Sequence, residues 1–337
     1  MSTQRIPAAD LGAVHIVDER AVRLDQYVER LTRYLTPSLT ERLFGDPDVN
    51  DFQINSDGWI WLDRHSAGRV HEGDFMPSER LEMFINAVAE HLGTVFDAQN
   101  DVLEGELPGP VFGGARFTAF GPPTASPPAI VVRKRATKIY TLTDYRHSEI
   151  ATQAQVDVLE QAILAGLNVV VCGAMRSGKT TFLNGLLAAL AQLRPRDRAV
   201  LVEDTPELQS SLPNTQRLIA GGPKGFRKLQ RPLNRTSADW TIFGEVRGQE
   251  ILSLFKMWLS DSHGFATFHG SDAEGVLERM NLLAMENRVP PQRHLIAKVA
   301  HVLVFLEGGS VRRRVREVVR VDGFDARERR FLFHRLA

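Results

Sequence analysis

The stretch NVVVCGAMRSGKTT, residues 168–181, decides the fold of this chain. Its first part, NVVVC, is a continuous apolar run rich in β-branched residues, which is typical of a strand buried on both faces. Its second part matches the pattern G-x-x-x-x-G-K-[ST], in which a glycine-rich loop joins a strand to a helix and its backbone N–H groups surround phosphate. We therefore expect a phosphate-binding loop, or P-loop, between a buried strand and a helix.

The loop predicts a nucleotide site with a magnesium ion. Lys179 is expected to reach the β and γ phosphates, and the Thr180 hydroxyl is expected to hold Mg²⁺. The residues predicted to bind ATP from this loop are Gly173, Ser177, Gly178, Lys179, Thr180 and Thr181.

Acidic side chains follow the next two predicted strands. VLVEDTPELQ places Glu203, Asp204 and Glu207 just beyond one strand, and WTIFGEVRG places Glu245 and Arg247 just beyond another. Because ligands of doubly wound sheets bind outside the carboxyl ends of the strands, both groups should converge on the P-loop. Glu203 and Asp204 are the predicted metal-site carboxylates, since hydrolysis needs carboxylates around the metal and its waters.

A histidine ends a further predicted strand. GFATFHGSDA sets Thr267 and His269 two residues apart, on one face of that strand. Taken alone, a histidine in such a place is more often structural than catalytic.

The order of elements predicts an α/β chain of two domains. Helical spacing over residues 24–35 and 78–93, with a hairpin over 51–64, indicates a small α+β domain of residues 1–140. Residues 141–150 are the predicted linker. In residues 151–337, Thr152 and Gln155 have the spacing of a capping box, and helices then alternate with strands, which favours a parallel α/β sheet.

Composition limits the classes of protein. The 337 residues carry 41 basic and 41 acidic side chains, so bulk charge does not indicate a nucleic-acid binder. Cys172, the one cysteine, is expected to be a small buried hydrophobe. No apolar run approaches the ~18 residues of a membrane helix, so we expect a cytoplasmic protein that could still dock on a membrane complex.

The arginine-rich segment 309–336 has two interpretations. Its clustered arginines suggest nucleic-acid binding, but VREVVRV and RRFLFHRL around a DGFD turn have the pattern of a solvated hairpin diluted by acidic residues. We favour the hairpin, and predict no direct nucleic-acid readout.

Together these motifs resemble the secretion ATPase superfamily, and within it the TrbB-like conjugative transfer ATPases of type IV secretion systems. The resemblance is carried by GAMRSGKTT, EDTPELQ, FGEVRGQE and TFHGSDA in that order, and by INSDGWIWL, ELPGPVFGGARFTAFGPP and VVRKRA in the first half. It covers most of the chain.

The resemblance implies a hexameric ATPase that uses ATP and Mg²⁺ and docks on inner-membrane components of a secretion system. It implies a PAS-like first domain, a RecA-like second domain and nucleotide between them, with Arg116, Arg133 and Arg135 contacting phosphate. The catalytic set that it implies is Glu207, Glu245, Arg247 and His269. Either glutamate could be the general base, and we favour Glu207 slightly.

The chain also departs from the family pattern. Met175 and Arg176 stand where the family usually has glycine or small residues, and arginines are missing at Ser237 and Trp240. Arg176 could replace one of these lost cations. The departures leave open a nucleotide-binding scaffold ring with weak turnover. A type IV pilus or type II secretion ATPase is a further alternative, whereas a small-molecule P-loop kinase is disfavoured because the boxes fit motor proteins better.

Overall fold

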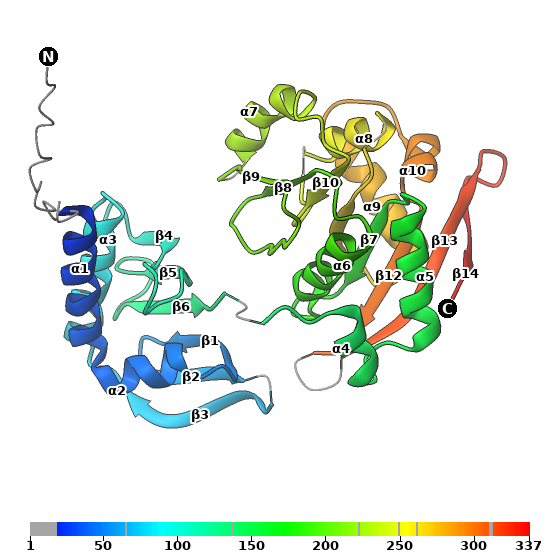
Figure 1. The fold of residues 1–337 in the computed structure, drawn as a ribbon. Coiled ribbons are helices and arrows are strands. Elements are labelled where there is room, and N and C mark those ends of the chain that lie inside the picture. The colour runs from blue at the N-terminus through cyan, green and yellow to red at the C-terminus, as the bar shows by residue number, and fades with distance from the viewer. Residues whose placement is uncertain are drawn as a thin grey trace, which may run out of the picture. The chain divides into compact units, whose positions relative to one another are not determined.

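The computed structural model describes residues 19–64, 66–135, 138–221, 223–248, 250–260, 262–309 and 313–337. These residues form two compact units, the first ending at Arg135. Residues 141–150, predicted as a linker, carry the short helix α4 (Leu142–His147) of the second unit. Each unit is described by itself (Figure 1).

The first unit packs helices on a six-stranded sheet. The strands have the order β3-β2-β1-β6-β5-β4. Their bounds are β1 Val49–Ile54, β2 Trp59–Arg64, β3 Gly68–Phe75, β4 Val102–Glu106, β5 Arg116–Phe120 and β6 Ala129–Arg133. The helical segments are α1 Glu19–Leu35, α2 Pro37–Thr40, η1 Glu41–Gly45 and α3 Ser78–His91.

The predicted periodicities of this unit are confirmed. Helices α1 and α3 lie side by side (Figure 1), joined by a stacked Tyr27–His91 pair and by an Arg30–Glu90 ion pair of 2.6 Å. Strands β1 and β2 form the predicted antiparallel hairpin, in which Gly58 takes a φ of 82° that suits glycine. The apolar faces of both helices and of the sheet make one core.

The second unit is built on an eight-stranded sheet of order β14-β13-β12-β7-β11-β10-β8-β9. Its strands are β7 Val169–Gly173, β8 Ala199–Glu203, β9 Thr215–Ile219, β10 Trp240–Phe243, β11 Phe265–His269, β12 Val302–Glu307, β13 Arg314–Asp325 and β14 Arg330–Arg335. Besides α4, its helices are α5 Gln153–Leu164, α6 Lys179–Leu193, α7 Pro223–Leu233, α8 Ile251–Leu259, α9 Ala273–Met285 and α10 Arg293–Val299.

Strand β7 lies inside this sheet and is buried on both faces. It pairs in parallel with β11 on one edge and β12 on the other. Val169 and Val171 pack with α5 and α6, while Val170 and Cys172 pack with α8, α9 and α10. The unit therefore has a layer of helices on each face of the sheet, and the prediction that Cys172 is buried is confirmed.

The sheet is parallel where the sequence predicted it and antiparallel at one end. Strands β9, β8, β10, β11, β7 and β12 are parallel neighbours, whereas β13 and β14 form the predicted hairpin. The position of its turn was predicted wrongly: DGFD lies within β13. A register shift between Val321 and Gly323 absorbs that segment into the strand, and the chain turns at Arg329, whose φ is 53°.

Helix α5 begins where the sequence indicates. The Thr152 side chain accepts from the Gln155 backbone N–H, and the Gln155 side chain accepts from the Thr152 N–H, so the capping box is confirmed. Gly166 follows the helix with a φ of 65°.

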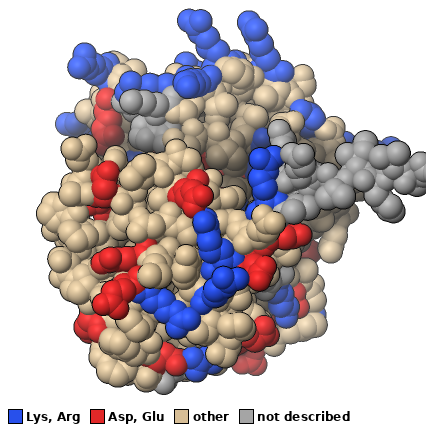
Figure 2. Space-filling view, turned by 90° about the vertical axis from the view of Figure 1, so that its left-hand side faces the viewer, with Lys and Arg blue, Asp and Glu red and all other residues tan. Residues whose placement is uncertain are grey.

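Charges of both signs are spread over the surface. On the face drawn in Figure 2, lysine and arginine side chains gather along the upper edge, and charges of both signs mix among uncharged residues over the lower half. Among the described helices, none has the length and apolarity that crossing a membrane requires.

Asn168 ties three elements of the second unit together. Its side-chain amide donates to Val299 O at 2.7 Å, and its Oδ1 accepts from Gly264 N at 2.9 Å. Val299 ends α10 and Gly264 precedes β11, so this buried side chain holds the start of β7 against both.

We expect Asn168→Ala to destabilise the protein by about 2–4 kcal/mol, because two buried backbone groups lose their partners. Asn214→Ala is the matched control, since the Asn214 side chain accepts one exposed hydrogen bond, from Arg198, and its loss should change stability by less than about 0.5 kcal/mol. Denaturant unfolding of the two variants measures the difference; equal midpoints would contradict this role of Asn168.

Candidate functional site

The P-loop runs from the end of β7 to the start of α6. Gly178 precedes α6 with a φ of 90°, a left-handed conformation that side chains other than glycine rarely adopt. At Gly173, a Cβ would lie 2.5 Å from Ser177 Oγ and 2.8 Å from Leu306 O. Both glycines of the motif are therefore required by the backbone path.

Lys179 points back into its own loop. The residue is buried, and Nζ donates to Gly173 O at 3.1 Å and to Ala174 O at 2.7 Å. His269 Nδ1 lies 3.4 Å from the same nitrogen. Burial lowers the pKa of Lys179, and the Glu245 charge opposes that shift. The loop thus concentrates a cation at the positive end of α6, as a phosphate site needs.

Glu245 joins the P-loop to two neighbouring segments. Its Oε1 lies 2.9 Å from His269 Nε2, and its Oε2 accepts from Arg247. Burial raises the pKa of Glu245, but the hydrogen bonds and charges of Arg247 and His269 outweigh burial and lower that pKa overall. His269 therefore bridges the Glu245 carboxylate and the Lys179 ammonium group.

The acidic segment that follows β8 lies beside the end of β10, where Gly244 N donates to Val202 O at 3.0 Å and a Cβ built on Gly244 would lie 3.3 Å from Glu203 Cγ. The charges of Asp204 and Glu207, after those of the hydrogen-bonded Glu245, help raise the pKa of Arg247. The structure thus brings the carboxyl ends of β8, β10 and β11 together near Lys179, which is the convergence that the strand order predicts.

Glu203 holds the backbone of that acidic segment. Its buried Oε1 accepts from Glu207 N at 2.7 Å and from Leu208 N at 2.6 Å. Arg217 Nε lies 3.3 Å from its Oε2, an ion pair without hydrogen-bond geometry. Burial raises the pKa of Glu203, and the two backbone hydrogen bonds oppose that shift. In this geometry Glu203 positions Glu207; its predicted part in a metal site stays a prediction.

Sequence reasoning missed two residues that shape the site. Asn184, on α6, donates to Glu207 O at 3.3 Å and accepts from Gln209 N at 2.9 Å. Glu250 accepts from the backbone N–H groups of Arg247 and Gly248 and so closes the turn after β10. Neither belongs to a spacing pattern, although an asparagine within the apolar helix LNGLL was a signal that could have been followed.

Two departures in the sequence have visible consequences. Met175 is 78% exposed, so its side chain lies outside the cradle, and Arg176 is exposed with a φ of 62°. Trp240 is buried, packs against Phe265 and donates to Asp197 at 2.8 Å, which is a core position. That Arg176 replaces a lost cation stays a prediction.

The three arginines predicted to reach phosphate from the first unit lie at one end of its sheet. Arg116 and Arg133 are register partners on β5 and β6. Arg133 pairs with Asp51 at 3.2 Å, and Arg135 pairs with Glu106 at 2.7 Å. They form a cationic cluster that is partly balanced by carboxylates.

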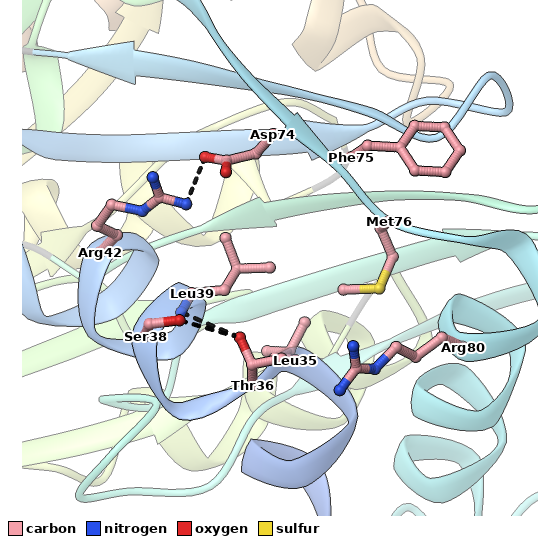
Figure 3. A pocket seen from close by; sticks show the side chains of 9 residues that line it. All are labelled: Leu35, Thr36, Ser38, Leu39, Arg42, Asp74, Phe75, Met76 and Arg80. Atoms are coloured by element: carbon pink, nitrogen blue, oxygen red, sulfur yellow. Dashed lines mark hydrogen bonds and ion pairs between the residues drawn. The ribbon is translucent and has the colours of Figure 1, made fainter.

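A separate hollow in the first unit lies beside α2 and β3 (Figure 3). Arg42 pairs with Asp74 at 2.5 Å, and Arg80 donates to Arg33 O at 2.9 Å, so each of its arginines already binds a neighbour. This hollow adds nothing to the candidate site.

The P-loop residues fit a nucleotide phosphate and one metal ion. Ser177 Oγ is buried without a hydrogen-bond partner among the described residues, and Gly173 leaves no room for a Cβ. Within the described chain, no three His, Cys, Asp or Glu side chains form a metal cluster. Mg²⁺ suits such a place, since it takes one or two protein ligands and completes its shell with phosphate oxygens and water.

Comparison with known proteins gives one family. The model of a family described as "Type II/IV secretion system protein" matches residues 116–306. The "Probable conjugal transfer protein TrbB" of Sinorhizobium fredii is 33% identical over 300 residues, which are 88% of this chain and 91% of that protein. The "Type IV secretion system protein PtlH" of Bordetella pertussis is 26% identical, over 83% of this chain and 92% of its own.

A solved structure shares the fold. The Yersinia pseudotuberculosis ATPase DotB has a TM-score of 0.58 with 14% identity, over 93% of this chain and 81% of that one.

The role of Glu203 predicts two different outcomes for two substitutions. Glu203→Ala should destabilise the protein by about 2–4 kcal/mol, because two backbone N–H groups, one buried and one partly buried, lose their acceptor. Glu203→Gln keeps an acceptor of the same shape and should destabilise far less. Denaturant unfolding checks both, and equal losses would contradict the role of the carboxylate as a backbone acceptor.

The stability difference between wild type and Glu203→Gln should depend on pH. Since burial raises the pKa of folded Glu203 above its ordinary value of 4.5, the unfolded chain loses this proton at a lower pH than the folded chain does, and stability falls as pH rises from about 4.5 through the folded pKa. Glu203→Gln lacks that fall. The stability of wild type relative to Glu203→Gln should therefore be greatest in acid; a gain of wild type with rising pH would contradict the raised pKa.

Proposed function

Because the chain belongs to the family of type II/IV secretion system proteins and is a type IV secretion ATPase, we propose that it works as a hexameric motor. In this proposal ATP hydrolysis powers substrate transfer or pilus assembly in a conjugative transfer system. The observation that carries it is the Lys179–His269–Glu245–Arg247 chain of contacts, which joins the P-loop to the ends of β10 and β11.

The two units have proposed fold families. The antiparallel sheet and helices of the first unit support a PAS-like domain, and the parallel sheet with a P-loop after a central strand supports a RecA-like domain. We propose that Arg116, Arg133 and Arg135 of the first unit contribute to binding the phosphates of ATP, since Arg116 and Arg133 are partners on adjacent strands and Arg135 follows two residues after the second strand. The protein is proposed to be cytoplasmic and peripheral at the inner membrane, docked on secretion-system components.

Four groups would act on bound ATP. Lys179 exchanges its loop carbonyl partners for phosphate oxygens, and backbone N–H groups from Gly173 to Thr181 orient the chain of phosphates. Thr180, with Glu203 or Asp204 acting through water, would hold Mg²⁺, which supplies positive charge to the phosphate oxygens. Arg247 adds a cation near the transferred group.

Glu207 is the proposed general base. Glu245 is held by two cationic or hydrogen-bonding partners and has a lowered pKa, so it orients His269 and Arg247 better than it accepts a proton. Glu207 sits on a backbone segment that Glu203 and Asn184 hold in place, so its carboxylate is carried on an ordered support.

Lys179→Ala should remove ATP binding and hydrolysis, because the loop loses its one buried cation for phosphate. Lys256→Ala, on the exposed face of α8, should leave both unchanged. Titration with ATP and steady-state phosphate release measure the two properties on the full-length chain. Equal turnover in wild type and Lys179→Ala would refute the motor. If wild type still bound ATP in that case, the result would favour a scaffold ring.

The two candidate bases are separated by matched substitutions. Glu207→Gln should lower turnover by about 10²–10⁴-fold at saturating ATP, because the attacking water loses its base. Glu245→Gln should impair turnover and also loosen His269 and Arg247. Near-normal turnover in Glu207→Gln with a large loss in Glu245→Gln would reverse the assignment.

The hexamer is tested on the same protein. Native mass spectrometry with and without ATP should give six copies in the nucleotide-bound sample. A monomer at all concentrations would contradict the ring.

A further inference from the structure

Arg313 lies directly over the P-loop, and no motif of the sequence assigned it a role. It precedes β13, in the connection from β12. A Cβ built on Gly178 would lie 3.4 Å from both Cδ and Nε of Arg313 and 3.6 Å from its Cζ. The guanidinium group therefore sits beside the glycine that precedes α6.

The position is unusual for an arginine that serves only the fold. Arg313 Nε is buried and makes no hydrogen bond to the described residues. Its neighbours behave differently: Arg314 pairs with Glu307 at 2.8 Å, and Arg316 pairs with Glu317 at 2.5 Å. Among the described residues, no carboxylate pairs with Arg313, so its charge lacks the balance that theirs have.

Helix polarity sharpens this observation. The first turn of α6 presents unpaired N–H groups and the positive end of the helix dipole, which disfavours a nearby cation. Lys179 adds a second cation at the same end. Two cations and a helix N-terminus together are stabilised by an anion between them.

The topology decides which part of a nucleotide Arg313 would meet. In the sheet order, β12 and β13 lie on one side of β7, whereas β11, β10 and β8, which carry the reacting residues, lie on the other. The γ phosphate must face that reacting side. Arg313 therefore lies toward the opposite end of the phosphate chain, which is the end of the α phosphate.

Tyr145 of α4 packs on the helix that follows the P-loop. Its ring packs on Phe182 of α6 with centroids 4.9 Å apart, and it is buried. Burial raises the pKa of Tyr145, and the charge of Arg313 opposes that shift.

We infer that Arg313 binds the α phosphate and nucleoside side of the nucleotide, from the edge of the P-loop opposite the acidic residues. This inference rests on the proposed function of the same site. It makes Arg313 a binding residue shared by ATP and ADP, with no part in the chemical step.

The test is binding of ADP and of the non-hydrolysable analogue AMP-PNP to full-length protein, by calorimetry. Arg313→Gln should weaken both ligands by a similar factor of about 10, as expected when a charge-assisted hydrogen bond is lost. Arg313→Lys should lose less, since it keeps the charge without the planar fork. Arg314→Gln is the matched control and should bind as wild type does, because that side chain is 65% exposed and pairs with Glu307.

Three results would overturn the inference. Unchanged affinity of Arg313→Gln, or loss for AMP-PNP alone, would remove the α phosphate contact. Equal loss in Arg314→Gln would make the effect one of general charge. The melting temperature of each variant without nucleotide separates binding from folding, and Arg313→Lys serves if Arg313→Gln does not fold.

Failure of the inference and failure of the proposed function look different. If wild type binds both nucleotides and Lys179→Ala does not, the P-loop site stands whatever Arg313→Gln does. If wild type binds neither nucleotide, the proposed function itself fails and the inference fails with it.

Discussion

The pairing of β7 along both of its edges is the constraint on which the second unit depends. Parallel partners on each side and helices on each face leave this strand no freedom to shift, and Asn168 ties its first residue to β11 and α10. The P-loop continues directly from it. The sheet therefore fixes the position of the loop, and the first turn of α6 lies next to the ends of β10 and β11.

A second set of residues holds the segments that follow β8 and β10 in place. Three side chains form hydrogen bonds with backbone groups of the two acidic segments: those of Glu203, Asn184 and Glu250. Because a buried N–H without a partner destabilises by ~1–3 kcal/mol, the bond from Leu208 N to Glu203 restrains its segment more strongly than an exposed ion pair would. Glu207 and Arg247 thereby gain fixed supports. The strands β8, β10 and β11, which carry the candidate site residues, lie on one side of β7, whereas β12 and β13, whose connection carries Arg313, lie on the other.

Much of this arrangement could be predicted, since local patterns carry it. The run of valines predicts a buried strand, the spaced glycines predict the loop, and Thr152 with Gln155 predicts the start of α5. The hairpin of β13 and β14 was predictable too, but its turn was misplaced, because Gly323 and its neighbours suit a turn as well as a bulge. The only signal for Asn184 was an asparagine within the apolar helix LNGLL, and no pattern set Arg313 apart from the arginines beside it, since each of the two contacts a segment distant in the chain.

By itself, the sequence determined the kind of elements, their order and the family, because periodicity and short motifs depend on residues close together in the chain. It also determined that Lys179 follows a glycine-rich loop between a buried strand and a helix. Only the tertiary structure decided that Glu203 accepts backbone hydrogen bonds, that His269 bridges Glu245 and Lys179, and that Arg313 lies over Gly178. These contacts join residues from 4 to more than 100 positions apart, and a distance across the sheet follows from strand order, which no local pattern contains.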